Sequence, residues 1–202
     1  MADGRRYAGL LVKGEERRRL ILEVAQRLLV RQGWRSTALS QIAREAGVSS
    51  AGVLHHFPSK EHLLNAVLDA RDADDMAHAD FSLDTLEQLA NVARRFERSP
   101  DLIGSFIVIL IENLGLDDPL HERVYKRHRV GARLIADSIR QGQRSGRYRT
   151  DVDPVVKAAE IQAFLNGMET SWLLDPSIPV TEVFREYTRA LKASLAPTGA
   201  GG

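Results

Sequence analysis

Hydroxyl, imidazole and ammonium side chains are concentrated between residues 37 and 60, and they suit recognition of an anion. Thr37, Ser49 and Ser59 are short side chains that can accept a hydrogen bond from a free backbone N–H at the start of a helix. Lys60 follows directly, and both lysine and helix N-termini favour anions such as phosphate. We therefore expect this segment to bind a charged partner.

Short helices must position these side chains, and the sequence from residue 17 to 69 predicts four of them. Gly33 ends a first helix, Gly47 supplies a left-handed turn between the second and third, and Pro58 stops the third. Apolar residues recur at helical spacing throughout and give each helix a buried face. Three short helices with a tight turn, followed by a capped fourth helix, have the layout of a helix-turn-helix DNA-binding unit.

The charge distribution agrees with this interpretation. The chain of 202 residues has a net charge of only +1, yet residues 1–60 carry 11 Lys and Arg against 5 Asp and Glu, giving +6. Residues 61–202 carry 17 against 22, giving −5. Positive charge on one segment is what a phosphate-binding module needs. A solvated, arginine-rich surface is the alternative, and charge alone does not decide between the two.

Signals for catalysis, cofactors and metals are weak. The chain has no cysteine, and it contains no glycine-rich phosphate loop, HExxH, GxSxG or paired-carboxylate pattern. We expect a protein that is not an enzyme and that uses no cofactor or metal. The strongest apolar run, residues 103–111, is far shorter than the roughly 20 residues of a membrane span. With no secretory h-region either, we expect a cytoplasmic location.

The remaining sequence predicts further helices and an all-α fold of about nine helices. An acidic, weakly apolar stretch at 71–80 suggests a solvated stretch or turn, followed by helices over 84–98 and 101–114. Asp118-Pro119 and Asp153-Pro154 each combine a cap with a first-turn proline, and a last helix covers 181–195. We therefore predict a helix-turn-helix DNA-binding domain at 1–70 with an N-terminal arm at 1–16, an effector-binding and dimerisation domain at 71–196, and a disordered tail at 197–202.

The segment from Ser36 to Leu64, STALSQIAREAGVSSAGVLHHFPSKEHLL, resembles the DNA-binding head of the TetR family of transcriptional regulators. The resemblance is continuous over about a quarter of the chain, and GMETSWLLDP near the end of the helix at 153–174 also looks like several family members. It implies that Thr37 caps the second helix and touches a phosphate, that residues 49–56 enter the major groove, and that Lys60 contacts phosphate.

Two positions depart from the family pattern. Leu54 stands where a phosphate-contacting Tyr is usual, and Gly52 stands where a Thr is common, so one or two backbone contacts are in doubt. For His55 and His56, the alternative is that one packs beside Phe57 and the other is merely exposed. The residues predicted to bind DNA are Thr37, Ser49, Ser50, Ala51, Gly52, His55, His56 and Lys60. Arg5, Arg6, Lys13 and Arg17 to Arg19 could form a basic arm in the minor groove.

A second site is expected in the later helices. The helix at 101–114 is apolar around most of its circumference, which fits either a cavity for an apolar ligand or a plain helical core. The predicted ligand-binding residues are Phe96, Phe106, Tyr125, Phe164, Met168 and Trp172. His121, Glu122, Tyr125 and His128 could be a metal cluster, but side chains that face solvent are the better interpretation.

Together these observations predict a homodimeric repressor that a small apolar effector releases from a palindromic DNA operator. By resemblance, residues 153–174 and 181–195 would pair with their copies in a four-helix interface. The alternatives are an activator or ligand-independent DNA binder, and a helical small-molecule-binding protein that has lost DNA binding.

Overall fold

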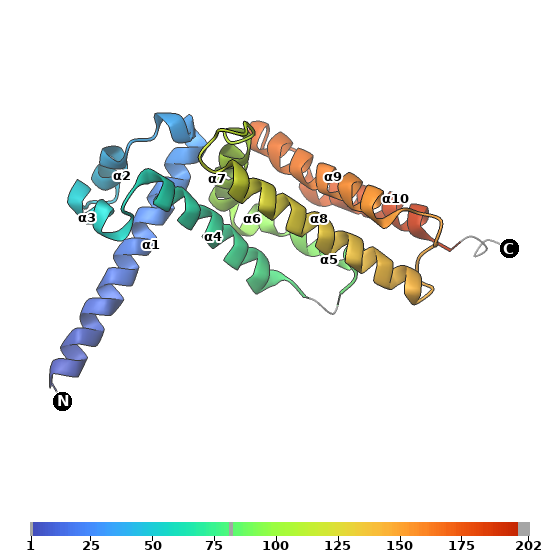
Figure 1. Cartoon of the computed structure of the whole chain (residues 1–202), viewed down its shortest axis with the longest axis horizontal. Coiled ribbons are helices and arrows are strands. Elements are labelled where there is room, and N and C mark those ends of the chain that lie inside the picture. Colours follow the sequence, from blue (N-terminus) through green and yellow to red (C-terminus); the bar gives the residue numbers. More distant parts are fainter. Residues whose placement is uncertain (1, 81–82, 198–202) are drawn as a thin grey trace.

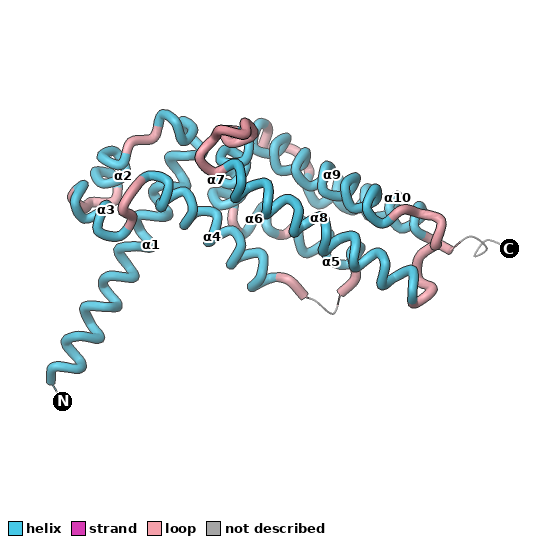
Figure 2. Tube along the Cα trace, in the orientation of Figure 1, coloured by secondary structure: helices cyan, strands magenta, loops and turns pink. Residues whose placement is uncertain are grey.

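A computed structural model describes the backbone of residues 2–80 and 83–197, and the side chains from residue 12 onward within these ranges apart from residue 90. The described part is helical, and Figure 2 shows no strand in it. The predicted all-α class is therefore confirmed. Residues 198–202 of the predicted disordered tail lie outside the described part. The described helices are α1 (Ala2–Ser36), α2 (Leu39–Glu45), α3 (Ser50–His56), α4 (Lys60–His78), α5 (Thr85–Ala93), α6 (Arg95–Arg98), α7 (Pro100–Ile111), α8 (His121–Arg144), α9 (Pro154–Leu174) and α10 (Val180–Leu195).

The first helix extends to the beginning of the chain. The predicted arm at 1–16 is helical from Ala2, and Figure 1 shows this end of α1 projecting away from the rest of the molecule. Gly33 has φ of 76° and interrupts the helical geometry near the other end. The expected stop at Gly33 is therefore present as a kink, and a short helical piece continues to Ser36. The side chains of Arg5 and Arg6 lie outside the described part.

The first four helices share an apolar core. We call α1, α2, α3 and residues 60–70 of α4 the head, and the rest of the chain the body. Each helix of the head is too short or too polar to be stable alone, so packing must hold it. The buried cluster of the head consists of Ile21, Val24, Ala25, Leu28, Ile42, Ala43, Ala46, Val53, Phe57, Leu63 and Ala66.

Helix α4 passes from the head into the body without a break. Its first half packs in the head, whereas Arg71 in its second half is buried in the body at 2% exposure. The prediction of a solvated stretch or turn at 71–80 is wrong, because the acidic residues there pair with arginines of other helices. A division into domains near residue 70 stays a prediction.

Helix α7 lies at the centre of the molecule, as its apolar composition predicts. It packs against α1, α4, α6 and α9, and Ile103, Ile107 and Ile109 are fully buried. Figure 1 shows α8, α9 and α10 running along the body beside it. The helix expected at 84–98 is divided into α5 and α6, which adds one helix to the expected nine. No helix in the described ranges has the length and apolar character that a bilayer crossing requires.

The capping predictions have mixed outcomes. Ser49, Ser59 and Asp153 each accept a backbone N–H at a helix start, as expected. The Asp118-Pro119 prediction is wrong, because α8 begins at His121 and the Asp118 carboxylate accepts the N–H of Gly115 at 2.8 Å instead. Asp118 therefore closes the loop before α8 rather than capping the helix.

Candidate nucleic-acid interface and body cavity

The turn between α2 and α3 has the geometry that a helix-turn-helix needs. Gly47 has φ of 65°, its N–H donates to the carbonyl of Arg44, and the N–H of Val48 donates to the carbonyl of Ala43 at 2.9 Å. These two bonds form a Schellman motif, which satisfies the last carbonyls of α2. Ser49 then caps α3 by accepting the N–H of Gly52 at 3.0 Å. The turn therefore fixes the direction of α3 with two backbone bonds and one side-chain cap.

Helix α3 presents one side to solvent and anchors the other in the head. Val53 is fully buried and Phe57 is 2% exposed, so these two side chains hold the helix on the core. The predicted DNA-binding residues Ser49, Ser50, Ala51 and His55 are exposed, and Gly52 and His56 are half-buried. Leu54, the position of departure from the family pattern, is 45% exposed on the same helix.

Thr37 does not have its predicted role. The N-cap of α2 is Ala38, which makes no side-chain bond, and the prediction that Thr37 caps this helix is wrong. The Thr37 hydroxyl instead donates to the carbonyl of Gly33 at 2.6 Å, because the kink at Gly33 leaves that carbonyl without its helical partner. At 1% exposure the side chain is inaccessible to a phosphate in this conformation.

Lys60 lies on the face of Trp34. Its Nζ is 4.2 Å from the centroid of the indole ring and 3.5 Å from the carbonyl oxygen of Arg35. Burial lowers the pKa of Lys60, and the carboxylate of Glu112 opposes that shift. The ammonium group is thus held at the start of α4, where it can donate to an anion at the surface.

Cationic groups of α1 approach the end of α3. Burial lowers the pKa of His56 below its usual 6.5, and His55, Arg17 and Arg18 lower it further. The guanidinium of Arg18 also lies 5.1 Å from the centroid of the Phe57 ring. The His56 imidazole is therefore mainly neutral at pH 7. A bound phosphate would offset the repulsion from the neighbouring cationic groups.

The head and body meet where α7 ends against the kink of α1. The N–H of Trp34 donates to Oε2 of Glu112 at 2.9 Å, and Arg35 pairs with Asp118 at 3.1 Å. A Cβ at Gly33 would lie 2.6 Å from Oε1 of Glu112, and its φ is positive as well. The positive φ therefore favours glycine here, and a Cβ would also displace the Glu112 carboxylate from Trp34.

The body contains a cavity of about 420 Å³, within the range that small-molecule sites occupy. Phe106 lines it, as predicted, but the other five predicted ligand-binding residues do not. Phe96, Phe164, Met168 and Trp172 pack in the apolar core between α5, α6, α9 and α10, where aromatic side chains fill the space between helices. Tyr125 is 45% exposed and stacks on His121.

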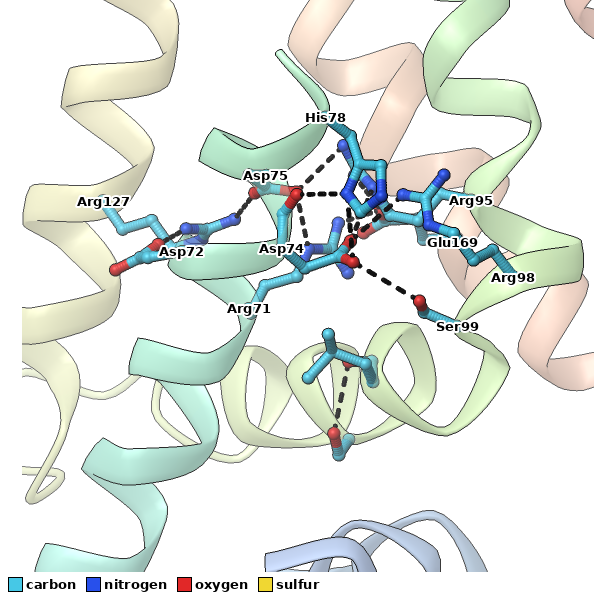
Figure 3. Close-up of polar contacts among 12 residues, drawn as sticks. Arg71, Asp72, Asp74, Asp75, His78, Arg95, Arg98, Ser99, Arg127 and Glu169 are labelled. Carbon is cyan, nitrogen blue, oxygen red and sulfur yellow. Dashed lines mark hydrogen bonds and ion pairs between the residues drawn. The ribbon is translucent and has the colours of Figure 1, made fainter. Parts of the chain in front are cut away.

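An ion network forms one wall of this cavity (Figure 3). Arg71 pairs with Glu169 at 2.5 Å, and both side chains are at least 95% buried. Arg95 lies 3.6 Å from the Glu169 carboxylate and 2.9 Å from that of Asp75. Arg127 pairs with Asp72 and Asp75. The network therefore joins α4, α6, α8 and α9.

The pKa values of the arginines reflect this crowding. Burial lowers the pKa of Arg71, but Glu169 and Asp75 outweigh burial and leave it above its ordinary value. Burial, reinforced by the charge of Arg71, lowers the pKa of Arg95 and lowers that of Arg127 to about 10. For these two guanidinium groups burial and the charge of Arg71 outweigh the nearby carboxylates.

Sequence reasoning missed these polar residues of the cavity. One signal was present: Glu169 is the only charged residue between positions 161 and 174, the later part of this helix. A lone charge in such a helix indicates a buried partner. The partner, Arg71, lies 98 residues away and could not be identified without the fold.

The described geometry defines a helical protein with a helix-turn-helix head for DNA and a body that encloses a cavity. The sequence model of "Bacterial regulatory proteins, tetR family" matches residues 21–67. This match covers the head alone and agrees with the resemblance of residues 36–64 to the DNA-binding head of TetR-family transcriptional regulators.

Relatives and solved structures extend the match beyond the head. The regulator TtgR of Pseudomonas putida is 25% identical over 81% of this chain and 83% of its own length. The repressor KstR2 of Mycolicibacterium smegmatis is 29% identical over 68% of this chain and 70% of its own length. The structure of a SmeT–triclosan complex superposes with a TM-score of 0.74 at 19% identity, covering 91% of this chain and 93% of that one. The last comparison supports the fold of the whole chain.

Proposed function

We propose that this regulator is a homodimeric repressor that binds a palindromic operator and is released from it by a small molecule. The observation that carries the proposal is the exposed side of α3, whose Ser50, Ala51 and His55 project from a helix anchored by Val53. In this proposal those residues, with Ser49, Gly52 and His56, read base edges or backbone, and Lys60 binds phosphate. Thr37 acts indirectly by holding the kink at Gly33.

A dimer is needed because one short recognition helix covers few base pairs. A two-fold axis places two such helices one turn of DNA apart, about 34–36 Å. The exposed face of α9 suits this contact, since small exposed residues recur there at every fourth position: Ala159, Ala163, Gly167 and Ser171. Small side chains let two helices approach closely, and the exposed Val155, Val156 and Leu174 add apolar surface. The predicted pairing of 153–174 and 181–195 with their copies is retained.

Changing the α9 face tests the dimer. A Cβ at Gly167 would meet no atom within 4 Å, so Gly167→Arg leaves the protomer intact. We expect this variant to be monomeric in light scattering and to bind a two-half-site operator at least about 10-fold more weakly, since the second half-site no longer adds affinity. Arg144→Ala, at the exposed end of α8 outside the proposed interface, is the control. A Gly167→Arg variant that remains a dimer contradicts this interface.

Effector release requires a path from the cavity to the head, and α7 offers one. Phe106 of α7 lines the cavity. Glu112, the residue that follows the last residue of α7, accepts the N–H of Trp34. Trp34 in turn contacts Lys60. A ligand that shifts α7 would therefore disturb a DNA-contacting side chain, and couplings of about 1–3 kcal/mol are typical. The triclosan complex of SmeT, a protein of the same fold, supports a small-molecule ligand.

In this proposal the present protein acts by binding rather than by catalysis, and we place it in the cytoplasm with its DNA.

A gel shift with the promoter region beside the protein's own gene tests the proposal. Lys60→Ala is expected to weaken binding to all sequences about equally and to lower the salt slope by about 1. Changing Ser50 or His55 is expected to alter preference among sequences. Arg144→Ala, which removes an exposed charge from the end of α8, should have no effect. The absence of a salt-sensitive, sequence-selective shift would refute the function, and identical behaviour of the Lys60 and His55 variants would refute the division of roles.

A further inference from the structure

The cavity wall holds three buried polar atoms without a hydrogen-bond partner. Two are donors, Nη1 of Arg71 and Nε of Arg95, and one is an acceptor, Oε1 of Gln162. Nε of Arg95 lies 3.8 Å from Oδ2 of Asp74, an ion-pair distance too long for a hydrogen bond. All three belong to side chains that line the cavity. A buried polar atom without a partner costs about 1–3 kcal/mol, and more when the group is charged. Such atoms gathered around one cavity indicate a ligand that supplies the missing partners.

The polar groups of the wall specify the chemistry of one end of that ligand. Five cationic side chains line the cavity against three carboxylates: Arg71, Arg95, Arg123, Lys126 and Arg127 against Asp72, Asp75 and Glu169. Two carboxylates outside the lining, Asp69 and Asp74, also pair with Arg123 and Arg95, so the free donors rather than the charge excess select the ligand. The side chain of Arg71 is only 3% exposed, so its free Nη1 cannot turn to bulk water. A carboxylate accepts two hydrogen bonds from guanidinium groups and is the natural partner for such donors.

The other walls are apolar. The Phe106 ring lies 4.9 Å from the guanidinium carbon of Arg71 and 4.8 Å from that of Arg127, so it borders the charged end. Leu110, Leu134 and Leu165 add further apolar side chains to the lining. An anionic head with an apolar body would therefore match both parts of the cavity.

The position of Gln162 indicates how far a second polar group of the ligand would lie from its carboxylate. Its amide Nε2 donates to the carbonyl of His128 at 3.0 Å, which fixes the amide and leaves Oε1 as an acceptor. Gln162 and Glu169 both line the cavity from α9, and seven residues of helix span about 10 Å. A hydroxyl or amide N–H on the ligand about 10 Å from its carboxylate would satisfy Gln162.

We propose that the effector is an amphipathic carboxylic acid, held by Arg71 and Arg95 at its carboxylate and by Gln162 at a hydrogen-bond donor on its apolar body. This proposal rests on the proposed function only in naming the ligand an effector, because binding itself is measured on the protein alone.

The first test uses the unmodified protein and matched ligands. Octanoate, decanoate and dodecanoate are compared by calorimetry and thermal shift with the primary amide and the primary amine of the same chain length. We expect at least one acid to bind about 10- to 100-fold more tightly than its amide, since a hydrogen bond to a charged group is the stronger one. The amine should not bind. The proposal is overturned if no acid binds, or if an amide or amine binds as tightly as its acid.

Two arginines that share a partner provide a matched pair of variants. Arg95 and Arg98 both approach Asp74, at 3.8 and 3.3 Å, but only Arg95 lines the cavity. Arg95→Gln is expected to weaken the acid about 10-fold and leave the amide unchanged, because one charged donor is lost. Arg98→Gln should leave both unchanged. Equal losses in the two variants would show a general effect on the network and overturn the assignment of Arg95.

The hydroxyl is tested separately with 10-hydroxydecanoate. It should bind more tightly than decanoate to the unmodified protein, and Gln162→Leu should abolish the difference. No preference for the hydroxylated acid overturns the role of Gln162. A final gel shift separates the two proposals: operator binding that persists in the presence of a tightly bound acid refutes its role as effector, whereas a failure of all acids to bind leaves the DNA-binding function standing.

Discussion

The head packs apolar side chains behind its exposed polar ones, whereas the body buries guanidinium and carboxylate groups in its wall. Among the described residues of the head, Thr37 is the one buried polar side chain, and its hydroxyl is satisfied by Gly33. In the body, Arg71 and Glu169 are both buried, and Nη1 of Arg71 has no hydrogen-bond partner. The head is thus built to present a fixed surface to a partner in water. The body keeps polar groups whose bonding is incomplete until a ligand arrives.

The largest effect is expected from breaking the buried ion pair. Arg71→Met removes the main partner of Glu169 and leaves a buried carboxylate, which costs about 3–5 kcal/mol in free energy of unfolding. Urea denaturation measures this loss. The described part of the head has no comparable buried charged pair, so its unfolding should respond only through the shared helix α4.

The double variant sharpens this prediction. Arg71→Met with Glu169→Met removes both charges and is expected to recover most of the lost stability, because an apolar pair can replace a buried ion pair at little cost. If the double variant is as unstable as Arg71→Met alone, packing of the Arg71 side chain rather than its charge is what matters.

The contact between the two regions should give a smaller effect. Glu112→Ala leaves the N–H of Trp34 without its acceptor, and we expect a loss of about 1–3 kcal/mol in stability together with a weaker response of DNA binding to ligand. Asp118→Asn, which weakens the pair with Arg35 but keeps an oxygen for the N–H of Gly115, is the control and should cost less than about 1 kcal/mol. A full ligand response in Glu112→Ala would show that the signal passes along another route, such as α4.

The head caps should give an effect of about 1 kcal/mol. Ser49→Ala removes the acceptor for the N–H of Gly52 at the start of α3, and Ser59→Ala removes the acceptor for the N–H of His62 at the start of α4. Each is expected to lower stability by about 1 kcal/mol in urea denaturation. Only Ser49→Ala should change preference among operator sequences. A change of preference in Ser59→Ala would move the reading surface beyond α3.

The smallest effect concerns pH. The pKa of His56 lies below 6.5 because of burial and the charges of His55, Arg17 and Arg18, with Glu15 opposing them. The folded free protein therefore binds fewer protons than its unfolded state, and protonation of His56 weakens the fold as pH falls through the lowered pKa. On DNA a phosphate favours the protonated form, so operator affinity should rise as pH falls from about 7 to 5.5. Titration of affinity against pH should give a flatter profile for His56→Gln. An unchanged profile would place His56 away from phosphate.

The two regions also differ in how far the sequence predicts them. Gly47 and Ser49 could be assigned because turn and cap bonds join residues three to five apart in the chain. Thr37 was assigned wrongly, since its hydroxyl responds to the kink at Gly33, a backbone event that periodicity does not show. The bonds of the cavity wall join α4, α6, α8 and α9. Only Phe106 could be predicted there, because its helix is apolar enough to be central.

Because of the ion network in the body, the stabilities of the two regions should depend differently on temperature. The free-energy cost of removing charges from water falls on warming, so the network becomes less unfavourable as temperature rises. The apolar core of the head gains no such advantage, and its hydrophobic stabilisation weakens on cooling. Cooling is therefore expected to weaken the apolar core of the head without strengthening the ion network of the body, which gains relative stability only on warming.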